Sequence, residues 1–184
     1  MFYNYLDKAT VYFEYGSGGS TYQASIRSNI SKIYSVESDI TWQNKLKKLI
    51  TSIKKSNKNI IYIFNEMYTR PNSWGNPGQK ATYIQKVNYS NHIVNLSKQE
   101  QTEIDFILID GRFRVACCLK CFDIINDNCL IAFDDFLDRK AYHIVLNYFD
   151  IVKKTIDNRM VILKKKSNVS VPPEIIKKYE LIQY

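Results

Sequence analysis

The 184-residue chain has few cysteines and no long apolar run, and each shortage excludes a class of protein. Its four cysteines, Cys117, Cys118, Cys121 and Cys129, lie in one short segment, with no second cluster to complete a four-ligand zinc site. We expect reduced thiols that pack in the core. No apolar stretch reaches the roughly 18 residues that a membrane-spanning helix requires, and the N-terminus lacks the basic and apolar regions of a signal peptide. A cytoplasmic protein without a membrane segment is therefore predicted.

Acidic residues are outnumbered, with 26 lysines and arginines against 18 aspartates and glutamates and a formal net charge of +8. Such a charge suits a polyanionic partner such as RNA. The lysines, however, spread along predicted helices and the tail, whereas a surface that follows a phosphate backbone interleaves aromatic residues with arginines. We interpret most of them as solvated faces. An anionic small substrate, for example a nucleotide-linked one, is also compatible with the charge.

Apolar, strand-like runs alternate with amphipathic stretches along the whole chain, which predicts a single α/β domain with helices on both faces of a mostly parallel sheet. The runs lack clean alternation, as expected for strands that are covered on both faces. Five strands are predicted at 10–15, 32–37, 59–65, 104–110 and 128–135. Two further runs, at 149–157 and 159–166, are expected to pair as an antiparallel hairpin and to bring the sheet to seven strands.

Helices are predicted between these strands from apolar spacing and capping residues. Their expected ranges are 20 or 21 to 29, 38 or 39 to 53, 79–89, 112–125 and 139–148. The segment 66–83 is rich in proline, glycine and aromatic residues and fits neither period, and irregular loops of that length are often functional. A proline-containing tail follows the last strand.

The sharpest local signal is the run from Glu14 to Thr21, which joins the first strand to the first predicted helix. Its glycines let the backbone turn tightly and approach a ligand closely. Glu37 ends the next strand, where a carboxylate can accept hydrogen bonds from both hydroxyls of a ribose. Together they predict a cofactor that contains adenosine, either a dinucleotide or S-adenosylmethionine. Candidate contacts are Glu14, Tyr15, Gly16, Ser17, Gly18, Gly19, Thr21, Glu37 and Ser38.

Two residues favour S-adenosylmethionine over the nicotinamide dinucleotide of a dehydrogenase. Thr21 stands where a dinucleotide site needs a third glycine or an alanine. The carboxylate of Glu14 would repel a pyrophosphate but attract the cationic amine of a methionine.

The pattern of apolar residues, an acid, one residue and then Gly-x-Gly resembles the first motif of class I S-adenosylmethionine-dependent methyltransferases. The resemblance runs from about residue 11 to 164 and includes the segments VYFEYGSGGST, IYSVESD, WGNP, DFILIDGRFRVACCLKCFDII and IAFDDF. Within this superfamily, the chain looks similar to small glycan or sugar O-methyltransferases of bacteria and large DNA viruses. It implies a Rossmann-like domain with a cofactor half at about 10–65, an acceptor and catalytic half at 66–165 and a tail at 166–184. It also implies that Glu14 supports the methionine end of the cofactor and, for a viral protein, a host-cytoplasmic location. Many relatives carry an extra helix before the first strand, where this chain has only about ten residues.

Three aspartates end the fourth and fifth predicted strands and are the candidate catalytic groups. Asp110, which would also border the cofactor, and the pair Asp134 and Asp135 become neighbours if the strand order is the usual one. Three carboxylates there repel one another unless a cation, a proton or an arginine intervenes. One answer is Mg²⁺ bound by all three, as the resemblance to metal-dependent O-methyltransferases implies.

The alternative is a general base without a metal, drawn from these aspartates or from His143, since histidine is a common general base in enzymes. Arg112 and Arg114, just beyond Asp110, are expected either to clamp a phosphate or carboxylate or to pair with the aspartates. The preferred function is O-methylation of a sugar or glycan hydroxyl. RNA ribose or cap methylation and a catalytically inactive, cofactor-binding partner subunit remain as alternatives.

Overall fold

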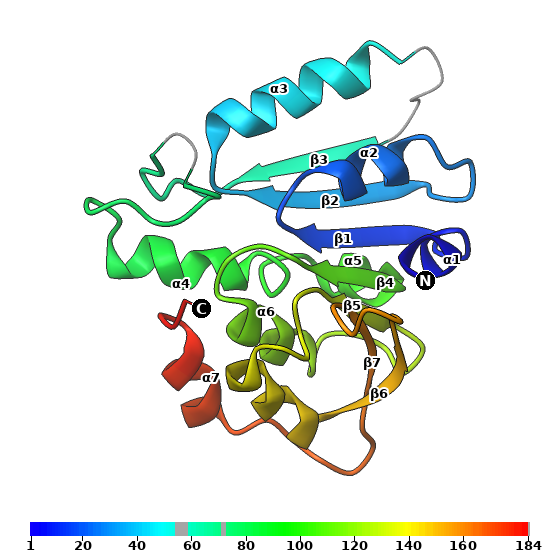
Figure 1. The fold of residues 1–184 in the computed structure, drawn as a ribbon, viewed down its shortest axis with the longest axis vertical. Coiled ribbons are helices and arrows are strands. Elements are labelled where there is room, and N and C mark those ends of the chain that lie inside the picture. Colours follow the sequence, from blue (N-terminus) through cyan, green and yellow to red (C-terminus); the bar gives the residue numbers. More distant parts are fainter. Residues whose placement is uncertain (54–58, 71–72, 184) are drawn as a thin grey trace.

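Seven strands form one sheet in the order β3-β2-β1-β4-β5-β7-β6 in the computed structural model, which describes residues 1–53, 59–70 and 73–183 (Figure 1). The strands are β1 Val11–Tyr15, β2 Lys32–Glu37, β3 Asn59–Phe64, β4 Phe106–Ile109, β5 Leu130–Phe133, β6 Phe149–Lys154 and β7 Val161–Lys165. The first five are parallel, and β7 pairs antiparallel with both β5 and β6. The predicted parallel sheet and its C-terminal hairpin are therefore confirmed.

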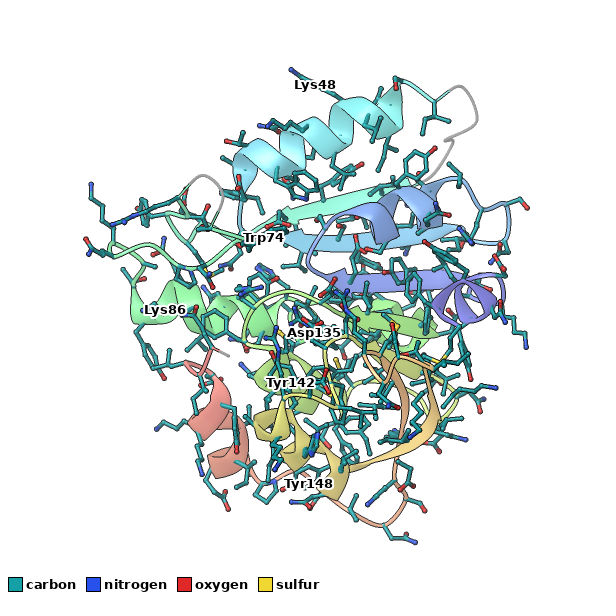
Figure 2. The ribbon with its side chains drawn as sticks, viewed as in Figure 1. Lys48, Trp74, Lys86, Asp135, Tyr142 and Tyr148 are labelled. Carbon is teal, nitrogen blue, oxygen red and sulfur yellow. The ribbon has the colours of Figure 1, made fainter. Side chains whose placement is uncertain are left out.

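Helices cover both faces of the sheet because successive strand residues point to opposite sides and both sets are apolar. On β1, Phe13 belongs to the larger core cluster, whereas Tyr12 belongs to the smaller one on the other face. Figure 2 shows side chains filling the space on both sides of the sheet. The helices are α1 Phe2–Leu6, α2 Gly19–Ser25, α3 Ile40–Thr51, α4 Tyr83–Asn91, α5 Lys98–Glu103, α6 Arg114–Cys121 and α7 Pro173–Tyr179, with a 3₁₀ helix η1 at Lys140–Asn147.

Several helices begin where the sequence places a capping residue. The Asp39 carboxylate accepts hydrogen bonds from the backbone N–H groups of Thr41 and Trp42, at 2.9 and 3.0 Å, and starts α3 as predicted. Helix α2 differs from the prediction, since it begins after Gly18 and ends at Ser25 rather than near residue 29. The Thr21 hydroxyl accepts a hydrogen bond from the Gly18 N–H instead of capping its own helix end.

Three short helices, α1, α5 and α7, are absent from the sequence-based prediction. Each has five to seven residues, so few positions repeat and the helical period is weak. Helix α1 lies within the stretch before the first strand and inserts Leu6 into the smaller core. The predicted helix at 139–148 is the 3₁₀ helix η1.

The four cysteines are buried, free thiols, as predicted. Cys117, Cys118 and Cys121 lie on α6 against the sheet, and burial raises the pKa of each thiol because the thiolate would lose its hydration. Among the described residues, no helix is long and apolar enough to cross a bilayer.

Candidate functional site

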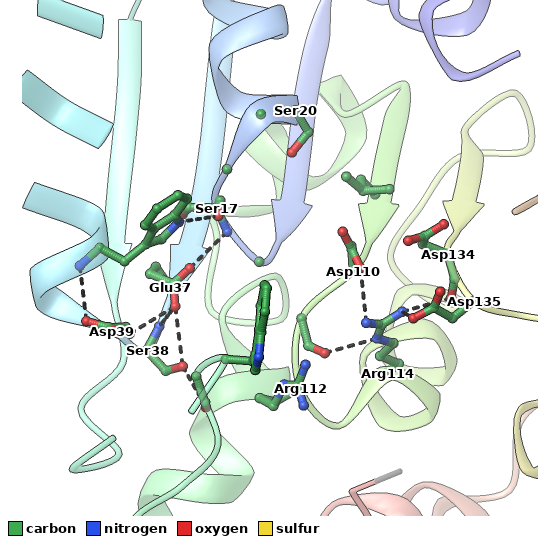
Figure 3. A pocket seen from close by; sticks show the side chains of 18 of the residues that line it. Ser17, Ser20, Glu37, Ser38, Asp39, Asp110, Arg112, Arg114, Asp134 and Asp135 are labelled. Carbon is green, nitrogen blue, oxygen red and sulfur yellow. Dashed lines mark hydrogen bonds and ion pairs between the residues drawn. The ribbon is translucent and has the colours of Figure 1, made fainter. Parts of the chain in front are cut away.

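A large pocket opens at the carboxyl ends of the parallel strands (Figure 3). In the described parts of the chain its walls come mainly from residues that follow β1, β2, β3, β4 and β5, and also from the N-terminus and the turn between β6 and β7. Because parallel strands end at one edge of the sheet, residues far apart in sequence meet there. Most of the site residues predicted from the sequence line it, namely Gly16, Ser17, Gly18, Gly19, Glu37, Ser38, Asp110, Arg112, Arg114, Asp134 and Asp135.

The glycine turn after β1 leaves its backbone open to the pocket. Gly16 has a φ of +95°, and a Cβ on it would lie 2.7 Å from the backbone oxygen of Asp110, so this position requires glycine. A Cβ on Gly18 or Gly19 would meet nothing within 4 Å, which means that their missing side chains leave space beside the turn. The indole N–H of Trp42 donates to the Ser17 carbonyl at 2.8 Å and ties the turn to α3.

Glu14, which was expected to support the methionine end of the cofactor, is not among the described residues that line the pocket. Its side chain is fully buried beneath the turn. One carboxylate oxygen accepts hydrogen bonds from the hydroxyls of Tyr12, at 2.9 Å, and Ser20, at 2.6 Å, and the other from Ser35, at 2.6 Å, and Thr21. Burial raises the pKa of Glu14 to about 7, although all four hydrogen bonds act in the opposite direction. The carboxylate therefore holds the glycine turn in place from its buried side.

Tyr15 and Thr21 also point away from the pocket. The Tyr15 side chain is buried in the larger core, where its hydroxyl donates to the backbone oxygen of Ser90 at 2.9 Å. Thr21 is fully buried and donates to Glu14. Tyr15 is the last residue of β1, and Thr21 lies on the buried side of α2 beside Glu14.

Glu37 lies at the end of β2 with 7% of its surface exposed to the pocket. One of its carboxylate oxygens accepts from the N–H groups of Ser38 and Asp39, at 2.6 and 2.9 Å, and the other from that of Ser17, at 3.1 Å. Burial raises its pKa, and these backbone donors oppose that shift. Three backbone groups thus fix the orientation of the carboxylate while one edge faces the pocket.

The predicted cluster of three aspartates exists, and arginines neutralise it. Arg114 lies 3.0 Å from Asp110 and 3.5 Å from Asp135. Arg159, in the turn between β6 and β7, lies 2.8 Å from Asp134 and 2.9 Å from Asp135. Of the two expectations for Arg114, a clamp for an anion or a partner for the aspartates, the structure supports the second (Figure 3).

The Mg²⁺ predicted at this cluster does not fit the donor set. Guanidinium groups occupy the positions between the carboxylates, and Arg139 adds a further ion pair to Asp135 at 3.0 Å. No group of three or more acidic, histidine or cysteine side chains in residues 1–53, 59–70 and 73–183 has the arrangement of a metal site. A cation would have to displace these arginines before it could bind.

Asp110 is the most accessible carboxylate of the cluster, with 41% of its side chain exposed. Asp110 lines the pocket. The loss of hydration raises the pKa of Asp110 to about 6, an effect that Arg114 opposes and Asp134 reinforces. Asp110 is thus a stronger base than an ordinary aspartate and is still mostly ionised at neutral pH.

His143 lies outside the set of described residues that line the pocket. Its ring stacks on Phe136, with centroids 5.3 Å apart, and one ring nitrogen lies 3.2 Å from the Leu137 carbonyl oxygen. Helix η1 turns it toward the core side, so the structure gives no support to His143 as a general base.

Sequence reasoning missed Arg139 and Arg159, which complete the cluster. Arg159 is 25 residues from its partner Asp134 and comes from a hairpin turn. No local spacing could have connected the two. Two aromatic residues of the loop after β3, Tyr68 and Trp74, also line the pocket, and Trp74 is 87% exposed.

Comparison with solved structures reveals the same architecture in other proteins. No model of a known protein family and no curated protein matches the chain. A methyltransferase-like protein from Silicibacter pomeroyi DSS-3 superposes with a TM-score of 0.78 at 24% identity, over 95% of this chain and 87% of that one. An rRNA methylase from Streptococcus thermophilus superposes with a TM-score of 0.55 at 13% identity, over 90% and 94%. The strand order, the antiparallel hairpin and these superpositions establish that the chain has the Rossmann-like fold of methyltransferases.

Proposed function

We propose that the chain transfers the methyl group of S-adenosylmethionine to a hydroxyl oxygen of a sugar or glycan. The observation that carries this proposal is the alignment of Glu37, the glycine turn and Asp110 along one pocket, at the ends of the adjacent strands β2, β1 and β4. Along the pocket, the Glu37 carboxylate would contact the ribose, and the open backbone of the glycine turn would contact the methionine part of the cofactor. The basic carboxylate of Asp110 comes next, beside the position of the methyl group. When bound, this cofactor supplies an electrophilic methyl group on its sulfonium.

Glu37 and the turn would hold the adenosine half. The Glu37 carboxylate keeps its orientation through the N–H groups of Ser17, Ser38 and Asp39, and its remaining lone pairs are available to ribose hydroxyls. Gly18 and Gly19 leave room for a ligand beside the backbone. The Glu37 carboxylate and the space beside the turn therefore support a cofactor that contains adenosine.

Asp110 would act as the general base toward the acceptor. As the acceptor oxygen forms its bond to the methyl carbon, the carbon–sulfur bond breaks and the hydroxyl proton passes to the Asp110 carboxylate. Arg114, 3.0 Å from Asp110, keeps that carboxylate in place. Asp134 and Asp135 offer further oxygens to neighbouring sugar hydroxyls, which is our reason for preferring a polyhydroxyl acceptor.

The first test is calorimetric titration of the protein with S-adenosylhomocysteine and, separately, with NAD. We expect binding of S-adenosylhomocysteine alone. Glu37→Ala should weaken it by about tenfold or more, because the ribose loses a charged acceptor. Glu103→Ala is the matched control, since Glu103 pairs with Lys32 outside the pocket. Binding of NAD alone, or unchanged affinity in Glu37→Ala, would contradict the assignment of the cofactor site.

The second test is transfer of a labelled methyl group to nucleotide sugars, glycans and capped RNA. Labelling of a sugar, with turnover falling roughly 10²–10⁴-fold in Asp110→Asn and the fold retained, is the expected result. Labelling of RNA would show instead that the acceptor is a ribose or the cap of an RNA. Affinity for S-adenosylhomocysteine without turnover on any acceptor would favour an inactive partner subunit.

A further inference from the structure

One arginine of the pocket, Arg112, has no acidic partner among the described residues. The other three arginines that line the pocket, Arg114, Arg139 and Arg159, each pair with an aspartate within 3.5 Å. The Arg112 guanidinium donates a hydrogen bond to a neutral group, the side-chain oxygen of Asn76, at 3.0 Å. Its buried Nε has no hydrogen-bond acceptor in the part of the chain that the structure describes.

This lack of an acidic partner leaves Arg112 in an unfavourable state when the pocket is empty. Its partial burial, and secondarily the nearby charge of Arg114, lower the pKa of its guanidinium. A buried N–H without a partner and a partly buried positive charge without an ion pair both cost free energy. A bound anion would remove both costs, and the planar guanidinium matches a carboxylate or phosphate with two parallel hydrogen bonds.

The position of Arg112 assigns that anion to the acceptor rather than to the cofactor. Arg112 follows β4, two residues beyond Asp110, whereas the glycine turn and Glu37 follow β1 and β2. The two neighbouring strand ends, β4 and β5, carry Asp110, Asp134 and Asp135, the groups placed above around the acceptor.

The backbone also holds Arg112 firmly in this position. Its carbonyl accepts a hydrogen bond from the Cys117 thiol at 3.3 Å, and Asn76 anchors its side chain from the loop after β3. A Cβ on the preceding Gly111 would clash with the Tyr89 hydroxyl at 2.0 Å, so the chain passes close to α4. A side chain fixed in this way binds an anion with less loss of conformational entropy.

We propose that Arg112 is the anion-binding residue of the acceptor site and that the acceptor is a sugar carrying a phosphate or carboxylate group. This inference rests on the proposed function for the identity of the reaction, but the anion site itself can be tested without turnover.

The experiment titrates inorganic phosphate into the full-length protein, both alone and saturated with S-adenosylhomocysteine, and follows binding by phosphorus NMR and calorimetry. The variants are Arg112→Gln, Arg112→Lys and a control, Lys48→Gln, which removes one positive charge from the outer end of α3 away from the pocket (Figure 2). We expect phosphate affinity to fall about tenfold or more in Arg112→Gln, less in Arg112→Lys and not in Lys48→Gln. Affinity for S-adenosylhomocysteine should stay within about twofold in all three, since the anion site is separate from the cofactor.

Three results would overturn the proposal. Equal phosphate affinity in Arg112→Gln and the parent protein would remove Arg112 from any anion site. An equal loss of phosphate affinity in Lys48→Gln would show that the loss in Arg112→Gln comes from the change in overall charge. A selective loss of S-adenosylhomocysteine affinity in Arg112→Gln would assign the arginine to the cofactor. If the parent protein does not bind S-adenosylhomocysteine at all, the proposed function fails, while the phosphate titration of the protein alone still decides whether Arg112 binds an anion.

Discussion

The buried carboxyl of Glu14 predicts a specific dependence of stability on pH. Burial raises its pKa from an ordinary value of 4.5 to about 7. The folded protein therefore binds a proton at this site over a range in which the unfolded chain has released it. The contribution of Glu14 to the free energy of unfolding is fully present below the pKa that Glu14 has in the unfolded chain. It is lost as the pH rises through the pKa that Glu14 has in the folded protein.

The size of the effect follows from the two pKa values. A pKa difference from 4.5 to about 7 corresponds to about 3 kcal/mol of unfolding free energy, lost between about pH 4.5 and about pH 8. Replacement by glutamine removes the ionisable group and keeps the volume. The stability of Glu14→Gln relative to the parent protein should therefore increase by about 3 kcal/mol across that range.

The assay is urea unfolding of both proteins at several pH values, followed by circular dichroism. The difference between the two proteins matters, because other groups titrate in the same range. Burial lowers the pKa of His92 to about 4, so His92 contributes stability above its unfolded pKa that is lost as the pH falls, the opposite sign. That contribution is common to both proteins and cancels. A constant difference in unfolding free energy from pH 4.5 to 8 would refute the argument.

The same variant separates the two roles considered for this residue. Glu14 lies beneath the turn, so Glu14→Gln at mildly acidic pH should bind S-adenosylhomocysteine as the parent protein does. Loss of that affinity in a folded variant would show that the carboxylate acts on the cofactor after all.

Three further predictions concern the turn, the histidine and the metal. Gly16→Ala should lower the unfolding free energy by about 2 kcal/mol, because the new Cβ would lie 2.7 Å from the Asp110 oxygen at a positive φ; a thermal or urea melt equal to that of the parent would contradict this. His143→Gln should retain turnover, since His143 stacks on Phe136 outside the pocket, and a large fall in kcat with intact fold would restore it as a base. Chelation with EDTA should leave turnover unchanged, because arginines already neutralise the aspartates; an activity that needs added Mg²⁺ would show that the ion displaces them.

The sequence predicts the sheet well because each strand is a dense apolar run covered on both faces. Such runs are typical of buried parallel strands when helical segments separate them, as α2, α3 and α6 do here. The hairpin of β6 and β7 is predictable for a similar reason, since two short β-forming runs lie close together in the chain. Helices α1, α5 and α7 are too short to show a period, and packing against the finished sheet decides them.

The sequence by itself determined the α/β fold class, the glycine turn after β1 and the acidic residues that end β2, β4 and β5, because each is a local pattern of residue types. Tertiary structure alone decided which of those side chains face the pocket. Glu14 is only two positions before Gly16, which lines the pocket. Four hydroxyl groups from β1, α2 and β2 nevertheless enclose its carboxylate in the interior. Arg159 reaches Asp134 from a distant turn, and that pairing leaves Arg112 as the arginine without an acidic partner in the described pocket. Charges pair through space rather than along the chain, so their balance in a site is a property of the folded molecule.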